Sequence, residues 1–291
     1  MNRAWVIGFA LAFLFSLANR SFGGAPEQET VTKPAEIFQG DILELKIPAE
    51  GLTAVQGRMG KVTIPFYPNG HGYFTTFVGV DLEARPGLAT VNVKSTTSLG
   101  TRRGTAIRLQ IKPKSFKQES FSVAAEFDQL SAEVIQRIRQ DQNQFARAFT
   151  SSAPERFWEG SFLLPVSSDV TSPFGYRRVI NGTPRAPHTG VDLKAALGTE
   201  VMAVNHGRVV LLGDFFFSGN SVVLDHGGGL YTAYFHLSEF KVEAGAPVRK
   251  GEVIALSGMS GRVTGPHLHW GARLNGARVD PFELLRKLPG N

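Results

Sequence analysis

The chain has 291 residues, of which 42% are hydrophobic and 19% charged, and it contains no cysteine. This composition excludes a disordered or collagen-like chain, and the length has room for two domains. The lack of cysteine excludes disulfide scaffolds, cysteine nucleophiles and Cys-ligated metal sites. The net charge of +6 favours contact with anionic polymers, but there is no run of five Lys or Arg residues, so we expect no nucleic-acid partner.

The N-terminus has the pattern of an export signal. A positive start at Arg3 precedes an apolar stretch over residues 4–18 that ends in small residues. The stretch is too short for a comfortable membrane span, which needs about 20 residues. We expect residues 1–23 to be a signal peptide, with an uncleaved anchor as the alternative. The mature chain would then have no stable transmembrane span and be periplasmic or secreted.

Residues 24–113 are predicted to form a β-rich N-terminal domain. Apolar and polar side chains alternate over residues 43–47, 62–66 and 107–111, with turn formers such as residues 68–70 between them. A period of two predicts half-buried antiparallel strands. We expect a small β-sandwich of immunoglobulin-like topology, without a catalytic cluster.

The pattern changes after this domain. Residues 114–159 are predicted to be a helical linker, because residues 131–149 place apolar side chains on one helical face. The sequence leaves open which domain this helix packs against. Residues 160–291 are predicted to form a C-terminal domain of buried strands, for example at 209–212 and 221–224, with one helix near the C-terminus.

Histidines are concentrated in this C-terminal region. On a strand, His267 and His269 would point to the same face about 6.6 Å apart, whereas His188 and Asp192 would lie about 13 Å apart along an ideal strand. Gly190 would allow a bulge or bend that brings that second pair together. Two imidazoles and one carboxylate, with a fourth position open, are a catalytic zinc composition. The spacing does not decide which histidine of the first pair would be a ligand.

The remaining histidines are interpreted individually. His71 lies in a turn and is expected to be solvated, and His206 and His226 flank turns and are expected to be structural. His236 lies between the two groups above.

Four segments with chemistry-bearing residues follow one another in a fixed order. They are Thr171-Ser-Pro-Phe-Gly-Tyr-Arg177, His188-Thr-Gly-Val-Asp-Leu193, Tyr234-Phe-His-Leu-Ser238 and Gly265-Pro-His-Leu-His-Trp270. This set resembles the LytM-type, lysostaphin-like zinc endopeptidases that cut peptidoglycan peptides, and the resemblance covers about residues 160–287. The β-rich region before it is similar in texture to the N-terminal domain of some bacterial members.

The resemblance implies a site and an activity. It implies that His188, Asp192 and His269 bind Zn²⁺ and that His236 and His267 are unligated catalytic histidines. It implies a compact antiparallel β-sheet metallopeptidase domain that hydrolyses peptide cross-links of peptidoglycan, with D,D-endopeptidase action on stem peptides favoured.

Alternatives follow from the same resemblance. The second hypothesis is a wall-binding regulator that activates a separate murein amidase. The resemblance argues against it, because no motif position departs from the family pattern. A third has the N-terminal domain covering the groove, with the predicted helix as a lever, and a regulatory protein partner is a further expectation. Arg177, Arg178 and residues 257–261 are expected to line the groove without a catalytic role.

Overall fold

The computed structural model describes residues 33–121, 131–150, 152–180 and 182–288. The expected signal peptide at residues 1–23 lies outside the described residues. Among those described, no helix is both long enough and apolar enough to cross a membrane. Strands dominate and most sheet pairings are antiparallel, which confirms the predicted mostly β class.

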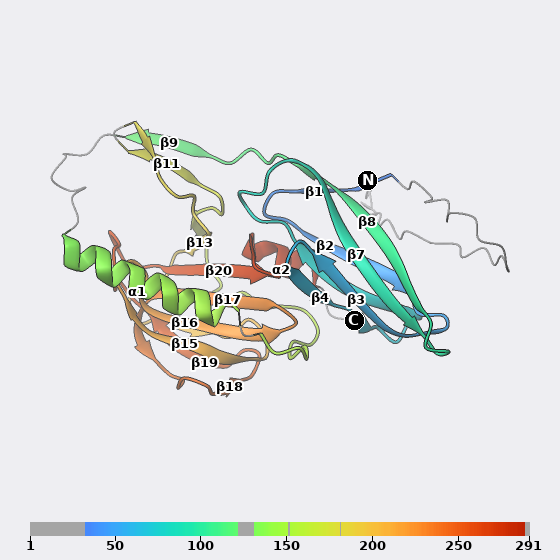
Figure 1. The fold of residues 1–291 in the computed structure, drawn as a ribbon. Coiled ribbons are helices and arrows are strands. Elements are labelled where there is room, and N and C mark those ends of the chain that lie inside the picture. Colours follow the sequence, from blue (N-terminus) through green and yellow to red (C-terminus); the bar gives the residue numbers. More distant parts are fainter. Residues whose placement is uncertain (1–32, 122–130, 151, 181, 289–291) are drawn as a thin grey trace, which may run out of the picture.

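The N-terminal part is a two-layer β structure around its own core (Figure 1). Its strands are β1 (Ala35–Phe38), β2 (Ile42–Pro48), β3 (Leu52–Met59), β4 (Val62–Pro65), β5 (Tyr67–Pro68), β6 (Tyr73–Gly79), β7 (Gly87–Thr97) and β8 (Arg102–Lys112). One sheet has the order β1-β8-β7-β3-β4 and the other β2-β6-β5. Because side chains alternate between the two faces of a strand, each sheet points one set inward. Val91 and Leu109 of the first sheet and Leu45 and Val78 of the second lie in one buried core. The immunoglobulin-like topology stays a prediction.

The C-terminal part is built on one ten-stranded sheet. Its strands are β10 (Val170–Ser172), β13 (Gly190–Leu193), β14 (Glu200–Met202), β15 (Gly207–Phe215), β16 (Gly219–Gly227), β17 (Leu230–Phe240), β18 (Pro247–Val248), β19 (Val253–Ser257), β20 (Leu268–Leu274) and β21 (Ala277–Val279). The main path runs β10-β13-β20-β17-β16-β15-β18. The predicted apolar runs at 209–212 and 221–224 lie in β15 and β16, and the predicted C-terminal helix is α2 (Pro281–Lys287), capped by Asp280.

The segment between the two parts is only partly helical. β9 (Gln118–Phe121) pairs in parallel with β11 (Arg177–Ile180), which also pairs with β12 (Thr183–Pro184). Just before β9, the Phe116 ring packs edge-on against Phe174 at 6.2 Å. The first residues of the predicted linker therefore join the C-terminal part, a long-range pairing that local periodicity does not reveal.

The predicted amphipathic helix is α1 (Ala132–Ala148), and it packs against the C-terminal sheet (Figure 1). Its Phe145 ring lies 4.7 Å from Phe215 and 5.6 Å from Phe235, centroid to centroid. Just past its end, Phe149 meets Tyr231 edge-on at 5.4 Å. The apolar stripe thus covers strands β15 and β17, which resolves the packing that the sequence left open.

The two parts are joined by an ion-pair network and a shared core. Arg278 on β21 donates to both oxygens of Asp81, at 2.6 and 2.9 Å, and to Glu83 at 2.9 Å. Ile42 and Leu82 of the N-terminal part are buried in the core of the C-terminal part. Strand β21, which pairs with β20, is thereby fixed from both sides.

Candidate metal centre

Two neighbouring strands place the first two functional side chains opposite each other. Strands β13 and β20 pair antiparallel, with Asp192 directly across from His269. Residues opposite each other in such a pair project from the same face with their Cβ atoms about 5 Å apart. His188 lies two residues before β13, so the separation from Asp192 expected along an ideal strand does not apply to it.

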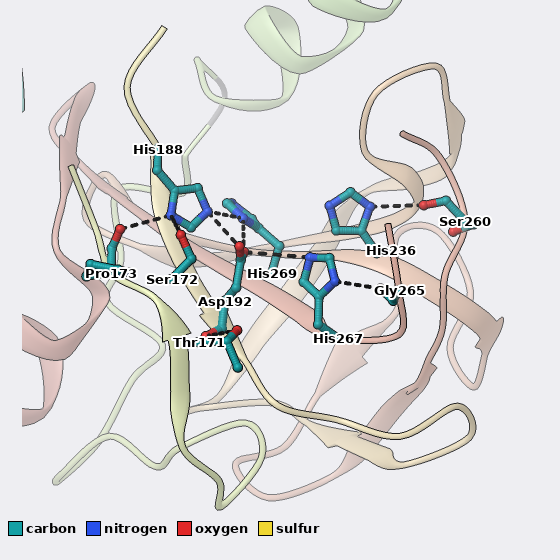
Figure 2. Close-up of polar contacts among 10 residues, drawn as sticks. All are labelled: Thr171, Ser172, Pro173, His188, Asp192, His236, Ser260, Gly265, His267 and His269. Atoms are coloured by element: carbon teal, nitrogen blue, oxygen red, sulfur yellow. Dashed lines mark hydrogen bonds and ion pairs between the residues drawn. The ribbon is translucent and has the colours of Figure 1, made fainter. Parts of the chain in front are cut away.

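The three side chains converge on one point (Figure 2). His188 Nε2 lies 3.0 Å from Asp192 Oδ1, His269 Nδ1 lies 2.9 Å from the same oxygen, and the two ring nitrogens are 2.9 Å apart. They are the group among the described residues whose ligand atoms could together hold a metal ion. All three are largely withdrawn from solvent.

The hydrogen bonds around the group are compatible with a bound cation. His188 Nδ1 lies 3.0 Å from the carbonyl oxygen of Pro173 and must carry its proton there, so in neutral His188 Nε2 presents a lone pair. That lone pair faces the Asp192 carboxylate, which is also an acceptor. Burial opposes ionisation of Asp192, but the adjacent His188 and His269 imidazoles hold its pKa below its ordinary value, so it is a carboxylate. A bound cation would satisfy all three ligand atoms at once.

The donor set fits zinc. Zinc takes imidazole nitrogen and carboxylate oxygen at about 2.0–2.2 Å in tetrahedral sites, which holds ligand atoms roughly 3.3 Å apart. The separations of 2.9–3.0 Å between the three atoms need shifts of only a few tenths of an ångström. A carbonyl that fixes the second nitrogen of a histidine ligand is a common feature of metal sites, and the Pro173 carbonyl would do this for His188.

Gly190 allows strands β13 and β20 to lie close together at this site. The pairing of β13 with β20 runs without a bulge from Gly190 to Leu193, so the glycine does not bend the strand. Instead, a Cβ built at Gly190 would lie 2.4 Å from the Trp270 oxygen and 2.6 Å from His269 Nε2. The expected bulge is therefore replaced by a close approach of the two strands that only glycine permits.

His236 reaches the same face because of a β-bulge in β17. Three steps along β17 between Tyr234 and Leu237 face two steps along β16, and His236 itself has a φ of 63°. In a regular strand, Phe235 and His236 would point to opposite faces. Here the Phe235 ring stacks on His269 at 5.2 Å with an angle of 4°, and the His236 ring lies 6.1 Å from His269.

His236 and His267 form a second pair beside the first group, as Figure 2 shows. Their ring centroids are 4.8 Å apart, and His267 Nε2 lies 3.8 Å from Asp192 Oδ1. His236 Nδ1 is 3.0 Å from the Ser260 carbonyl and His267 Nδ1 is 2.9 Å from the Gly265 carbonyl. Both Nδ1 atoms are therefore donors, and both Nε2 atoms are left as proton acceptors.

Burial sets the charge state of one of these rings. It lowers the pKa of His236 to about 4, against a smaller opposing effect of the Ser260 carbonyl. His236 is thus a neutral imidazole at pH 7.

The turn expected only to line the groove contributes directly to the site. Gly258 forms an isolated β-bridge with His267, and Ser260 holds His236. Backbone carbonyls carry no sequence signal, so the positions of Pro173, Ser260 and Gly265 could not be found from residue types. Arg177, by contrast, packs over Phe116 at 5.9 Å.

The other histidines lie away from this centre. His71 is exposed, as expected. His226 is fully buried, with Nδ1 2.7 Å from the His206 carbonyl and Nε2 2.7 Å from Thr232 Oγ1. Their interpretation as non-catalytic residues agrees with these contacts.

Comparison with known proteins places the centre in a family context. The profile of Peptidase family M23 matches residues 186–281. The DD-carboxypeptidase/endopeptidase Mpg of Neisseria meningitidis serogroup B is 44% identical over 125 residues, which are 43% of this chain and 29% of that protein. The peptidoglycan DD-endopeptidase ShyA of Vibrio cholerae is 42% identical over 122 residues, 41% of this chain and 28% of that protein. The chain therefore spans less than a third of the length of these curated relatives.

The likeness to one solved structure extends over both halves of the chain. A Pseudomonas aeruginosa protein described as a peptidase M23 is 25% identical, with a TM-score of 0.67 over 88% of this chain and 96% of that one. The two-part architecture is thus shared with that protein, beyond the segment that the family profile matches.

Proposed function

Because residues 186–281 form a domain of peptidase family M23, we propose that this protein is a zinc-dependent endopeptidase that hydrolyses peptide cross-links of peptidoglycan. The observation that carries the proposal is the convergence of His188, Asp192 and His269 on one point, with two acceptor imidazoles beside it. D,D-endopeptidase action is the specific form we favour, since the printed names of Mpg and ShyA describe that activity.

His188, Asp192 and His269 would hold the metal through Nε2, Oδ1 and Nδ1. Zn²⁺ at such a site supplies Lewis acidity, which makes water a nucleophile near neutral pH and polarises the scissile carbonyl. The carbonyl of Pro173 keeps His188 in the tautomer that this role needs.

His236 and His267 would handle protons. Each has Nδ1 tied to a backbone carbonyl, so Nε2 is the atom that can accept a proton from the attacking water and return it to the leaving amine. A protonated Nε2 can also stabilise the developing oxyanion. The 4.8 Å separation of the rings allows both to act on one substrate group.

An extracytoplasmic location follows from this substrate, because peptidoglycan lies outside the cytoplasm. We propose that residues 1–23 are the export signal and that the mature protein works in the periplasm or is secreted. The net charge of +6 favours contact with a polymer rich in carboxylates.

The test is digestion of purified cross-linked peptidoglycan by the protein, with and without a chelator, followed by mass analysis of the released fragments. Conversion of dimeric to monomeric muropeptides only without chelator supports the proposal. A zinc-loaded protein that binds the wall, leaves every dimer intact and stimulates an added amidase would instead support the regulator hypothesis.

A further inference from the structure

The metal-bearing face of the sheet continues into a cavity beneath α1. The cavity has a volume of about 240 Å³ and reaches from the metal centre toward the junction with the N-terminal part. Its floor is formed by alternate residues of β20, namely His269, Gly271 and Arg273, and its roof by the Phe145 and Phe149 rings. It is therefore an apolar space that opens beside a proposed metal ligand.

One cation in this cavity has no direct anionic partner among the described residues. The Arg273 guanidinium lies over the Phe149 ring at 4.4 Å, and among the described residues no hydrogen bond or ion pair reaches it. Burial lowers the pKa of Arg273, the nearby Arg278 charge adds to this effect, and the Asp81 charge opposes it. Arg273 and Arg278 are also direct cross-strand neighbours, and the Arg278 charge is already paired with Asp81 and Glu83.

The carboxylates around the cavity are already engaged elsewhere. Both oxygens of Asp81 accept hydrogen bonds from Arg278, which Glu83 also contacts. Asp141 accepts from the Phe216 backbone N–H at 2.8 Å. Asp141 is eight residues before Phe149, about 12 Å along the helix, so it sits at the other end of the cavity from Arg273.

We propose that Arg273 binds a carboxylate of the stem-peptide substrate, with the aliphatic part next to that carboxylate filling the cavity between Gly271 and α1. The inference rests on the proposed function and adds a specificity determinant to it. His269 and Arg273 are four residues apart on one strand, about 13 Å between Cα atoms, and the arginine side chain spans part of that distance.

This subsite selects among cross-links by their chemistry. Stem peptides offer ionised carboxyl groups on aliphatic chains, which match an apolar cavity in which Arg273 has no direct anionic partner. Glycine bridges have neither a side chain to fill the space nor a carboxylate to pair with Arg273. The cavity therefore favours stem-peptide cross-links.

The test measures binding separately from cleavage. The probes are a stem tetrapeptide with free carboxylates and the same peptide with its carboxylates converted to carboxamides, titrated calorimetrically into the full-length zinc-loaded protein. We expect the wild type to bind the carboxylate form about tenfold tighter or more, because bonds to an ionised acceptor are roughly twice as strong. In Arg273→Gln this preference should fall to about twofold or less, and Arg273→Lys should retain part of it.

Two further variants separate this role from a structural one. Arg139→Gln removes the same charge from an exposed position on α1 and should keep the wild-type preference. Gly271→Ala should fold, because its Cβ would lie 3.6 Å from the Thr189 oxygen and 3.8 Å from the Ala233 Cβ, which are ordinary contacts. The Gly271→Ala substitution should weaken binding of the carboxylate peptide severalfold, because the added methyl group narrows the cavity.

The outcomes are distinct. An unchanged carboxylate preference in Arg273→Gln, or no preference in the wild type, overturns the inference even if the wild type cleaves cross-linked dimers. Failure of the wild type to cleave dimers in a parallel digestion contradicts the proposed function, while the binding comparison still decides the role of Arg273.

Discussion

Replacing Gly190 by alanine tests whether the close approach of β13 and β20 builds the metal centre. The added Cβ would lie 2.4 Å from the Trp270 oxygen and 2.6 Å from His269 Nε2. The first contact is with backbone, which a side-chain rotation cannot relieve. The strands must therefore separate two residues away from the facing pair Asp192 and His269.

The size of the effect follows from these distances. Restoring ordinary van der Waals contact requires an opening of about 1 Å. Overpacking of this kind typically costs about 1–3 kcal/mol of unfolding free energy. A displacement of about 1 Å at a reacting centre can cost about a hundredfold in rate. The three ligand atoms, now 2.9–3.0 Å apart, would no longer converge.

The assay is zinc content after dialysis, together with urea unfolding and dimer cleavage. Gly104→Ala is the matched control, because its Cβ would meet nothing within 4 Å. We expect Gly190→Ala to lose most of its zinc and activity while Gly104→Ala keeps both. Full zinc occupancy and activity in Gly190→Ala would show that the close approach of the two strands is not needed for the site.

Three more outcomes are expected. His236→Ala should keep its zinc while cleavage falls by about 10²-fold or more, and loss of zinc there would contradict a proton-transfer role. Asp192→Asn should lose zinc because the anionic ligand is removed, so stoichiometric zinc after dialysis would count against Asp192 as a ligand. Burial lowers the pKa of His226 from 6.5 to about 4, so below pH 6.5 the unfolded chain takes up a proton that the folded protein does not. Stability should therefore fall by about 2 kcal/mol between pH 7 and pH 5. In urea titrations at several pH values, His226→Gln should lack this part of the decrease. An equal loss of unfolding free energy between pH 7 and pH 5 in both proteins would contradict the prediction.

Local patterns predicted much of the fold because each depends on neighbouring residues. Alternation over residues 43–47 and 107–111 located β2 and β8, and the helical period located α1. The pairing of β9 with β11 and the packing of α1 on the sheet depend on contacts far apart in sequence, such as Phe116 with Phe174. Periodicity cannot reveal such contacts.

The candidate site shows the same division. Residue types identified the histidines and Asp192 as candidates, because those side chains can bind metal and transfer protons. The bulge that turns His236 toward His267, and the carbonyls of Ser260 and Gly265 that fix their tautomers, are backbone features. Any residue type can supply a carbonyl, so geometry was needed to find them.

The most direct test of the account is anomalous X-ray diffraction at the zinc edge on crystals of the protein grown with zinc. The account predicts one strong peak within bonding distance of His188 Nε2, Asp192 Oδ1 and His269 Nδ1, with His236 and His267 outside that distance. A peak bound by His267 in place of His269, or no peak among these residues, would contradict it.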